Sequence, residues 1–290
     1  MSEHTEKALY GIIGYPLEHS LSPAMHNAAF KALEVDAEYQ KFPLKPDELK
    51  PFFDELKSKE SPIFGFNVTV PYKETVLPYI DTLTPLAQKI GAVNTVVINK
   101  NRKLLGYNTD APGFMTHLVE QAFDPLGKRV AILGAGGSAR AIVATLCMIP
   151  DRPESIKIYN RTPSRMEELL SDLGSRFDTS IVEPVASLDD LNVELCDFLI
   201  NTTSVGLKDT DPLLVDPDSL HADMLVYDLI YNPPETALLR AARERGAKAA
   251  NGLGMLFYQG ILALQHWANT QLEDDIKLIM RKALEEAIKA

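Results

Sequence analysis

The sequence predicts an α/β protein of two domains, each built on a mainly parallel sheet. Strand-like and helix-like segments alternate along all 290 residues, which is typical of parallel sheets covered by helices. This length suits two domains, and hydrophobic residues make up 46% of the chain, enough for a core in each. A glycine-rich turn at 134–139 restarts the strand–helix pattern and marks the second unit.

The first domain is expected over residues 1–109. Its strands are predicted from short apolar or alternating runs, and its helices from apolar residues that recur every three or four positions. In order, the predicted elements are a strand at 8–14, a helix at 23–33, a strand at 37–44, a helix at 45–58, a strand at 65–70, helices at 73–80 and 85–91, and a hairpin at 94–108.

The second domain is expected over residues 110–253, opened by a linking helix at about 111–122. An amphipathic stretch at about 255–289 closes the chain, and its pattern alone is compatible with either domain. The strands of the second domain are predicted within 128–134, 155–162, 197–204 and 225–233, and the first leads through the glycine turn into a helix.

The strand at 65–70 is expected to have two unlike faces. Its apolar residues alternate with Asn67 and Thr69, so polar and apolar side chains fall on opposite sides. Pro71 ends the strand because proline has no N–H for the ladder, and Lys73 follows two residues later. The polar side is either solvent-exposed or holds a small polar molecule.

Composition argues against several classes of partner. Asp and Glu outnumber Lys and Arg by 40 to 29, giving a net charge of -11 without a basic block, so we expect no nucleic acid. Cys147 and Cys196 lie far apart in apolar runs without metal-ligand spacing, so we expect no metal site. We expect a cytoplasmic protein without membrane contact. The cysteines are expected to be buried thiols, the sequence has no signal-peptide pattern, and no apolar run is long enough to span a bilayer.

Residues 134–139 form a candidate phosphate-binding loop. Gly134, Gly136 and Ala139 fit the G-x-G-x-x-G/A pattern of dinucleotide sites, and Gly137 adds a further glycine. Glycines allow the tight turn and let backbone N–H groups approach a pyrophosphate at the helix N-terminus. The alternative is a plain turn between strand and helix, but the order of strand, turn and helix favours nucleotide binding.

The end of the next strand predicts which nucleotide is bound. An NAD site usually has Asp or Glu there, on the ribose 2′-hydroxyl, whereas this chain has Asn160, Arg161 and no carboxylate. Thr162 is expected to cap the following helix, which puts Arg165 in its first turn. A cation there opposes the helix dipole, so we expect an anion such as a 2′-phosphate beside it. Otherwise both arginines are ordinary surface residues.

Four polar residues elsewhere are candidates for a substrate site. Ser22 at the N-cap, followed by proline, would begin a helix without any ligand, but two hydroxyls beside a helix N-terminus, those of Ser20 and Ser22, also make a carboxylate site. The residues alone do not separate these interpretations. Asn94 in "IGAVNT" and Asp110 in "GYNTD" are the others, although Asp110 would equally serve as the N-cap of the linking helix.

Taken in order, these and further stretches resemble the shikimate dehydrogenase family over nearly the whole chain. Their number and order make the resemblance specific, far beyond that of a glycine loop alone. The stretches are "HSLSPAMHN", "FNVTVPYK", "IGAVNT", "GYNTD", "GAGGSARA", "NRT", "NTTSVG", "DLIYNPPET" and "NGLGM" followed by "YQG".

The resemblance implies a fold and a reaction. The first domain binds substrate and is completed by helices in 254–290, and the second is a Rossmann-like NADP-binding domain, with a cleft between the two. The implied reaction is the interconversion of 3-dehydroshikimate and shikimate with NADP (NADPH), in the biosynthesis of chorismate and the aromatic amino acids. We expect a monomer or a homodimer.

The resemblance also implies site residues, each at a matching position. Lys73 and Asp110 match the catalytic pair and also contact substrate. Substrate contacts are further implied for Ser20 and Ser22 on the carboxylate, for Asn67, Thr69, Asn94 and Gln259 on the ring hydroxyls, and for Tyr231; cofactor contacts are implied for Gly134, Ala135, Gly136, Gly137, Ser138, Ala139, Asn160, Arg161, Thr162, Arg165, Thr202, Gly252, Gly254 and Met255.

Lys73 suits the chemistry of such a reaction. Hydride transfer to a ketone creates alkoxide character, which a nearby acid must neutralise. Lys73 is expected either to donate that proton or to anchor the charge, with Asp110 orienting it. Two other functions stay open: an NAD-linked quinate/shikimate dehydrogenase and a non-catalytic NADP-responsive regulator. "SLS" and "NRTPSR" favour the NADP-linked enzyme, and a regulator would need neither Lys73 nor Asp110.

Overall fold

The computed structural model describes residues 7–289, which divide into two compact units. Unit 1 comprises Met1–Thr109 and Phe257–Ala290, and unit 2 comprises Asp110–Leu256. The sequence places the corresponding boundaries after residues 109 and 253. Residues 1–6, where the expected first domain and the start without a signal-peptide pattern begin, lie outside the described range.

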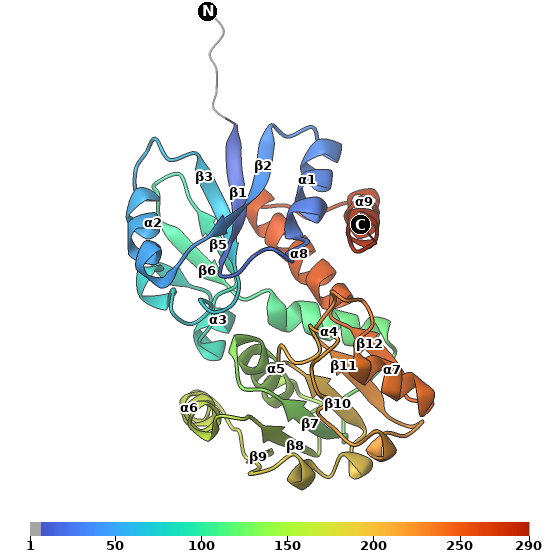
Figure 1. The fold of residues 1–290 in the computed structure, drawn as a ribbon. Coiled ribbons are helices and arrows are strands. Elements are labelled where there is room, and N and C mark those ends of the chain that lie inside the picture. The colour runs from blue at the N-terminus through green and yellow to red at the C-terminus, as the bar shows by residue number, and fades with distance from the viewer. Residues whose placement is uncertain (1–6, 290) are drawn as a thin grey trace, which may run out of the picture. The chain divides into compact units, whose positions relative to one another are not determined.

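Unit 1 is a mixed six-stranded sheet with helices on both faces (Figure 1). The strand order is β2-β1-β3-β5-β6-β4; β1 runs parallel to β2 and β3, and β4 to β6, whereas β5 is antiparallel to both neighbours. Its elements are β1 (Ala8–Gly14), α1 (Ser22–Ala32), β2 (Ala37–Pro43), α2 (Leu49–Glu55), β3 (Ile63–Val68), β4 (Thr82–Leu83), α3 (Pro85–Ile90), β5 (Thr95–Ile98), β6 (Leu104–Tyr107), the greater part of α8 (Leu253–Ala268), and α9 (Asp274–Ala287).

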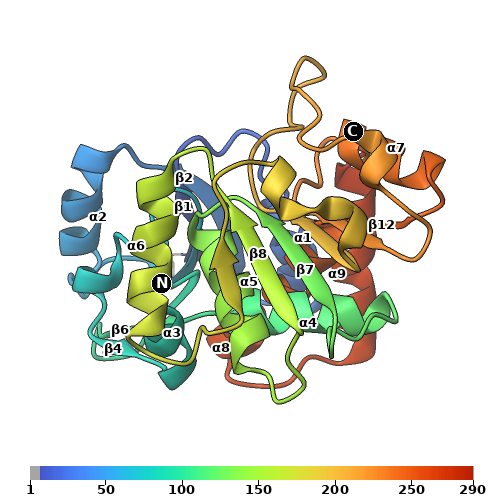
Figure 2. The same ribbon diagram turned by 90° about the horizontal axis from the view of Figure 1, so that it is seen from below.

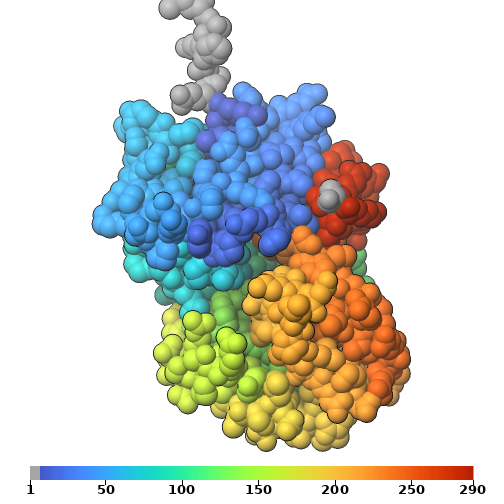
Figure 3. All heavy atoms as spheres, in the orientation of Figure 1, coloured from blue at the N-terminus to red at the C-terminus, as the bar shows by residue number. Residues whose placement is uncertain are grey.

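The two faces of this sheet are covered differently. Phe66 of β3 packs with Phe52 and Phe53 of α2 in one apolar cluster. On the opposite face, Trp267 of α8 donates from Nε1 to the carbonyl of Val96 at 3.0 Å. A side chain at Gly65 would meet that indole ring, with a Cβ placed 2.4 Å from its Nε1, so the close approach of α8 requires glycine. Figure 3 shows the C-terminal helix α9, in red, against the blue surface of α1.

Unit 2 is a fully parallel sheet of order β12-β11-β10-β7-β8-β9. Numbered within the unit, this is the order 3-2-1-4-5-6 of the doubly wound dinucleotide-binding fold, with β7 and β8 side by side in Figure 2. Its elements are α4 (Asp110–Glu120), β7 (Arg129–Leu133), α5 (Gly137–Met148), β8 (Ser155–Tyr159), α6 (Pro163–Gly174), β9 (Val182–Pro184), β10 (Phe198–Asn201), β11 (Leu225–Asp228), α7 (Ala237–Glu244), β12 (Lys248–Asn251) and the start of α8.

The predicted fold class, α/β with mainly parallel sheets, is confirmed, but two local predictions are wrong. Residues 73–80 form turns and a short 3₁₀ helix, Leu77–Tyr79, in place of an α-helix, because Pro78 lacks the N–H that an α-helix would need. The strand expected at 65–70 spans 63–68, so Val70 lies beyond it and is 58% exposed. Among the described helices, none has the length and apolarity needed to cross a membrane.

Two predicted helix caps also differ. Ser22 is not an N-cap: the backbone of Leu21 is already helical, so α1 begins at Ser22 and no side chain caps it. Thr162 does occupy the N-cap of α6, but its hydroxyl makes no capping hydrogen bond. Ser22 is nevertheless 2% exposed, so its hydroxyl needs a role other than capping.

Candidate active site

Polar side chains of unit 1 are buried where the carboxyl ends of β1 and β3 meet. Asn67, Lys73 and Asn94 are 4%, 8% and 3% exposed, although burying such groups is unfavourable unless they are hydrogen-bonded. Because β1 and β3 are parallel neighbours, the segments that follow them leave the same edge of the sheet. Open α/β sheets bind their ligands at this edge.

Asn67 of β3 has a fully defined hydrogen-bonding environment. Its Nδ2 donates to the backbone carbonyl of Asn94 at 3.1 Å and to Oγ1 of Thr95 at 3.0 Å, and its Oδ1 accepts from the hydroxyl of Tyr39 at 2.7 Å. A backbone carbonyl only accepts, which fixes the orientation of this amide. The supposed polar face of the strand is therefore buried.

Asn94 connects β5 to the end of β6 and to α8. Its Oδ1 accepts from the backbone N–H of Thr109 at 2.7 Å, and its Nδ2 donates to Thr109 Oγ1 at 2.9 Å and to Gln259 Oε1 at 3.4 Å. The structure thus brings together three residues predicted to bind the ring hydroxyls, Asn67, Asn94 and Gln259. Tyr39, Thr95 and Thr109 complete the network, and sequence reasoning missed all three. Thr95 lies in "IGAVNT" and Thr109 in "GYNTD", but a threonine at the end of a strand gives no signal of a role in a site.

Lys73 is tied to the same region through its backbone. Its carbonyl accepts from the N–H of Val93 at 2.8 Å, which holds the turn after β3 beside Asn94. Asp110, the other half of the predicted catalytic pair, is 5% exposed at the first position of α4 and belongs to unit 2. It directly follows Thr109, whose backbone is held by Asn94.

Ser20, Ser22 and Thr69 lie in the segments just beyond β1 and β3. Ser20 is half-buried in the turn before α1, where its N–H donates to Leu17 O at 3.1 Å. Thr69 packs against the end of β1, since a Cβ at Gly14 would lie 2.4 Å from its Cγ2. Two hydroxyls beside the N-terminus of α1, that of Ser20 before it and that of Ser22 at its first residue, suit a carboxylate, because helix N-termini attract anions.

In unit 2 the glycine turn lies where the sheet order reverses, between β7 and β10. Gly134 has a φ of +105°, and a Cβ there would lie 2.5 Å from Oγ1 of Thr202. Thr202 itself donates to the carbonyl of Leu133 from its N–H at 2.8 Å and from Oγ1 at 2.6 Å. A Cβ at Gly136 would meet nothing within 4 Å, so the start of α5 is open to a pyrophosphate, as a dinucleotide site requires.

The predicted phosphate site after β8 is an exposed, positively charged turn. Arg161 and Arg165 are exposed, and among residues 7–289 neither makes an ion pair. The first turn of α6 has no acidic residue, and Asn160 supports the turn by donating to the carbonyl of Thr162 at 2.8 Å. These residues fit a 2′-phosphate and provide no carboxylate for a 2′-hydroxyl.

The segment leading into α8 packs against the loop after β11. A Cβ at Gly252 would lie 2.0 Å from the carbonyl oxygen of Leu229, and one at Gly254 2.3 Å from Nε2 of His117. The N–H of Gly252 donates to Ile230 at 3.3 Å. Gly252, Gly254 and Met255 are therefore held beside the loop that carries the half-buried Tyr231.

Asp228, at the end of β11, connects the end of β10 to the loop after β11. Sequence reasoning missed this residue. Its carboxylate accepts from Asn201 Nδ2 at 3.0 Å, from the N–H of Ile230 at 3.1 Å and from Thr236 Oγ1 at 2.7 Å. Burial raises the pKa of Asp228 to about 6, although these hydrogen bonds favour the charged form. The motif "DLIYNPPET" does not by itself show whether its aspartate, Asp228, has a structural or a catalytic role.

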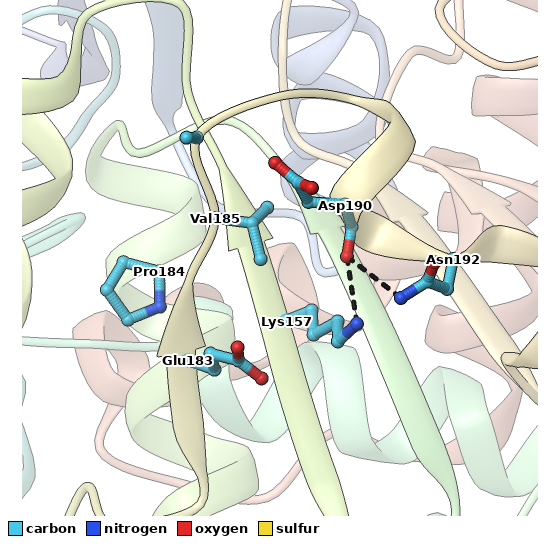
Figure 4. A pocket seen from close by; sticks show the side chains of 7 residues that line it. Lys157, Glu183, Pro184, Val185, Asp190 and Asn192 are labelled. Atoms are coloured by element: carbon cyan, nitrogen blue, oxygen red, sulfur yellow. Dashed lines mark hydrogen bonds between the residues drawn. The ribbon is translucent and has the colours of Figure 1, made fainter.

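A shallow pocket of about 350 Å³ lies elsewhere in unit 2, beside β8 and β9 (Figure 4). Its lysine, Lys157, and Asn192 both donate to the carbonyl of Asp190, at 2.8 and 3.3 Å. Because both side chains already donate to the Asp190 carbonyl and none of the predicted site residues lines the pocket, it is not the candidate site. No group of three potential metal ligands is found in the described part of the chain.

Comparison with known proteins gives consistent matches. The family model described as "Shikimate dehydrogenase substrate binding domain" matches residues 12–96. The NADP(+) shikimate dehydrogenase of Desulforamulus reducens is 42% identical, over 96% of this chain and 94% of that protein. The crystal structure of shikimate dehydrogenase from Aquifex aeolicus has a TM-score of 0.85 at 35% identity, covering 99% of both chains. The Thermus thermophilus enzyme, solved with NADP(H) and shikimate, has a TM-score of 0.82 at 32% identity, covering 97% of this chain and 99% of that one.

Proposed function

The chain belongs to the shikimate dehydrogenase family, and from this premise we propose how its residues carry out the reaction. It is an NADP-dependent oxidoreductase that interconverts 3-dehydroshikimate and shikimate, a step in aromatic biosynthesis through chorismate. The observation that carries our proposal is the buried amide network of Asn67, Asn94 and Gln259 at the carboxyl edge of the first sheet. It supplies directed polar groups for a hydroxylated ring.

Unit 1 is proposed to bind the substrate and unit 2 the cofactor. Ser20 and Ser22 hold the carboxylate at the start of α1, and Asn67, Thr69, Asn94 and Gln259 bind the ring hydroxyls. NADP supplies the hydride when bound. The residues that hold it are the 134–139 turn for the pyrophosphate, Arg161, Thr162 and Arg165 for the 2′-phosphate, and Asn160, Thr202, Gly252, Gly254 and Met255 around the rest, with Tyr231 near the substrate.

Lys73 is the proposed acid. In the reducing direction the ketone oxygen gains alkoxide character, and the Lys73 ammonium donates a proton to it and stabilises the developing charge. In the oxidising direction the same amine takes the proton back. Asp110 orients the ammonium and balances its charge. Burial around Lys73 strengthens this interaction, since electrostatic effects grow where water is excluded.

The experiment that tests the function follows nicotinamide absorbance with shikimate or quinate, each with NADP or NAD. We expect turnover with shikimate and NADP to exceed every other combination. A preference for quinate and NAD would identify the NAD-linked relative, and no turnover in any combination would identify a non-catalytic regulator. Two exposed arginines, beside a first helical turn that has no acidic residue, support the NADP-linked assignment.

Location and assembly remain predictions. We propose a cytoplasmic protein, because Cys147 and Cys196 are buried free thiols and such thiols persist in reducing compartments. A monomer or homodimer is expected, and light scattering on the purified protein distinguishes the two.

A further inference from the structure

Tyr39 of β2 provides a second layer behind the substrate-binding amides. Its side chain is 1% exposed, and its hydroxyl donates to Oδ1 of Asn67 at 2.7 Å. Both amide hydrogens of Asn67 are already donated, to the Asn94 carbonyl and to Thr95. The hydrogen-bonding position of the Asn67 side chain that remains for a ligand is therefore the second lone pair of Oδ1.

Two residues of α1 hold Tyr39 in place. Asn27 brackets its backbone, since Asn27 Nδ2 donates to the Tyr39 carbonyl at 2.9 Å and the Tyr39 N–H donates to Asn27 Oδ1 at 2.8 Å. The ring of His26 stacks on the Tyr39 ring, with centroids 4.5 Å apart and an angle of 16° between the planes. The helix that begins at Ser22, one of the two serines proposed to bind the carboxylate, thus also fixes the phenol behind Asn67.

We propose that Tyr39 is a positioning residue for the substrate, acting through Asn67. Its hydroxyl holds the Asn67 carbonyl oxygen in the orientation in which the remaining lone pair accepts a hydrogen bond from a substrate hydroxyl. Without that donor, Asn67 Oδ1 loses one of the contacts that fix the amide, and rotation of the amide would present N–H groups in place of an acceptor. This inference rests on the proposed function, in which Asn67 contacts the ring.

The test compares Tyr39→Phe with the full-length parent and with Tyr10→Phe. Tyr10 belongs to the same aromatic cluster, with its ring centroid 5.1 Å from that of Trp267 and 5.2 Å from that of Phe30, but the hydrogen bonds of Asn67 are to Tyr39, Asn94 and Thr95 and not to Tyr10. Steady-state constants are measured for shikimate and NADP, together with thermal stability. A second series uses two shikimate analogues, each lacking one of the two hydroxyls that do not react.

We expect Tyr39→Phe to raise KM for shikimate about 3- to 10-fold, the effect of losing one neutral hydrogen bond. The kcat and the KM for NADP should stay within twofold, because the lost interaction serves substrate binding alone. Tyr10→Phe should leave all constants unchanged. One of the two deoxy analogues lacks the hydroxyl that donates to Asn67 Oδ1. With that analogue, Tyr39→Phe and the parent should have the same kcat/KM.

Three results would overturn the inference. They are an unchanged KM with a lowered melting temperature, an equal loss with shikimate and both analogues, and an equal loss in Tyr10→Phe. A parent enzyme that does not oxidise shikimate at all would instead refute the proposed function, so the two failures are distinguishable.

Discussion

At the scale of single residues, burial indicates which polar side chains are candidates for a functional role. Lys73 is only 8% exposed and lies in a turn held by the hydrogen bond from Val93. Lysine side chains are rarely buried unless they have a function or a partner. The neighbouring amides are oriented by backbone groups, so the site is largely formed before substrate arrives. If Lys73 is the acid of this site, as proposed, a pre-organised site of this kind should lose activity sharply when Lys73 is removed.

Replacing Lys73 by Ala should lower kcat by about 10²- to 10⁴-fold, the range for a positioned acid. The fold should persist, because the Ala variant keeps the Lys73 backbone carbonyl that accepts from the N–H of Val93 and holds the turn. Lys89→Ala, which removes an exposed lysine of α3, is the matched control and should turn over at the parental rate. Rates are measured in both directions, with circular dichroism as the check on folding. A folded Lys73→Ala protein near parental activity would contradict the assignment.

His26 should make the protein sensitive to acid. It is fully buried with no hydrogen-bond partner on either ring nitrogen among the described residues, and burial lowers its pKa to about 3. The unfolded chain takes up a proton near pH 6.5, whereas the folded protein does not until about pH 3. Stability is therefore lost as pH falls through that window, by about 1.4 kcal/mol per pH unit.

His26→Phe should flatten this acid-side slope by one proton, as measured by urea unfolding from pH 7 to pH 4. The exposed His19→Ala is the control and should leave the slope unchanged. An unaltered slope in His26→Phe would mean that other groups set the acid limit. The comparison concerns the slope alone, since the larger phenyl ring also changes packing.

The residues also show how far the sequence alone could be read. Motif order singled out Asn67, Asn94 and Gln259 as candidates, but not the hydroxyls of Tyr39 and Thr95 that orient Asn67. Those contacts join β2, β3 and β5, so they depend on strand order, which no local pattern contains. Asp228 was missed for a related reason, since its partners come from β10 and from the N-cap of α7.

At the scale of elements, the start of α1 is clearer in the structure than in the sequence. Ser22 fits the cap pattern, yet the helix begins one residue earlier than the pattern predicts. The helix expected at 73–80 fails because an apolar pattern does not outweigh Pro78 within it. The strands and the nucleotide unit were predictable because buried strands and a glycine turn have strong local signatures.

Ser20→Ala and Ser22→Ala should each weaken shikimate binding by roughly 0.5–3 kcal/mol, the scale of a hydrogen bond to a charged group. Neither should lower the melting temperature much, because neither side chain caps α1. Thr84→Ala provides the contrast: Thr84 does cap α3, so its loss should cost about 1 kcal/mol of stability without changing KM. Reversal of this pattern, with serines affecting stability and not KM, would make them structural.

The first turn of α6 should determine cofactor choice. Removing both guanidiniums in Arg161→Ala/Arg165→Ala should weaken NADP strongly, by about 1.5–3 kcal/mol for each charge-assisted hydrogen bond lost, and leave NAD nearly unaffected. The readout is kcat/KM for each cofactor. Arg240→Ala/Arg243→Ala on α7, which removes two exposed arginines paired with Glu235, is the control. A parent that prefers NAD would refute the phosphate site.

At the scale of the whole molecule, two units with separate cores should respond separately to their ligands. A ligand at 100 times its Kd stabilises its binding state by about 2.7 kcal/mol. NADP alone should therefore slow amide exchange around β7 and the start of α5, and shikimate alone around β3 and β5. Hydrogen-exchange mass spectrometry measures both. Protection by NADP confined to unit 1 would contradict the proposed division of labour.

The discontinuity of unit 1 affects how the chain is made. Its first sheet leaves the ribosome early, but Trp267 of α8, which covers Gly65 and binds the Val96 carbonyl, follows only after residues 110–256 have been synthesised. At about 5–20 residues per second this delay is about seven to thirty seconds. During that time the face of the sheet that carries Tyr10 is covered by Phe30 of α1 but lacks the cover that Trp267 provides. A nascent chain stalled before α8 is therefore a natural client for chaperones, and unit 2 is the part that can complete its fold first.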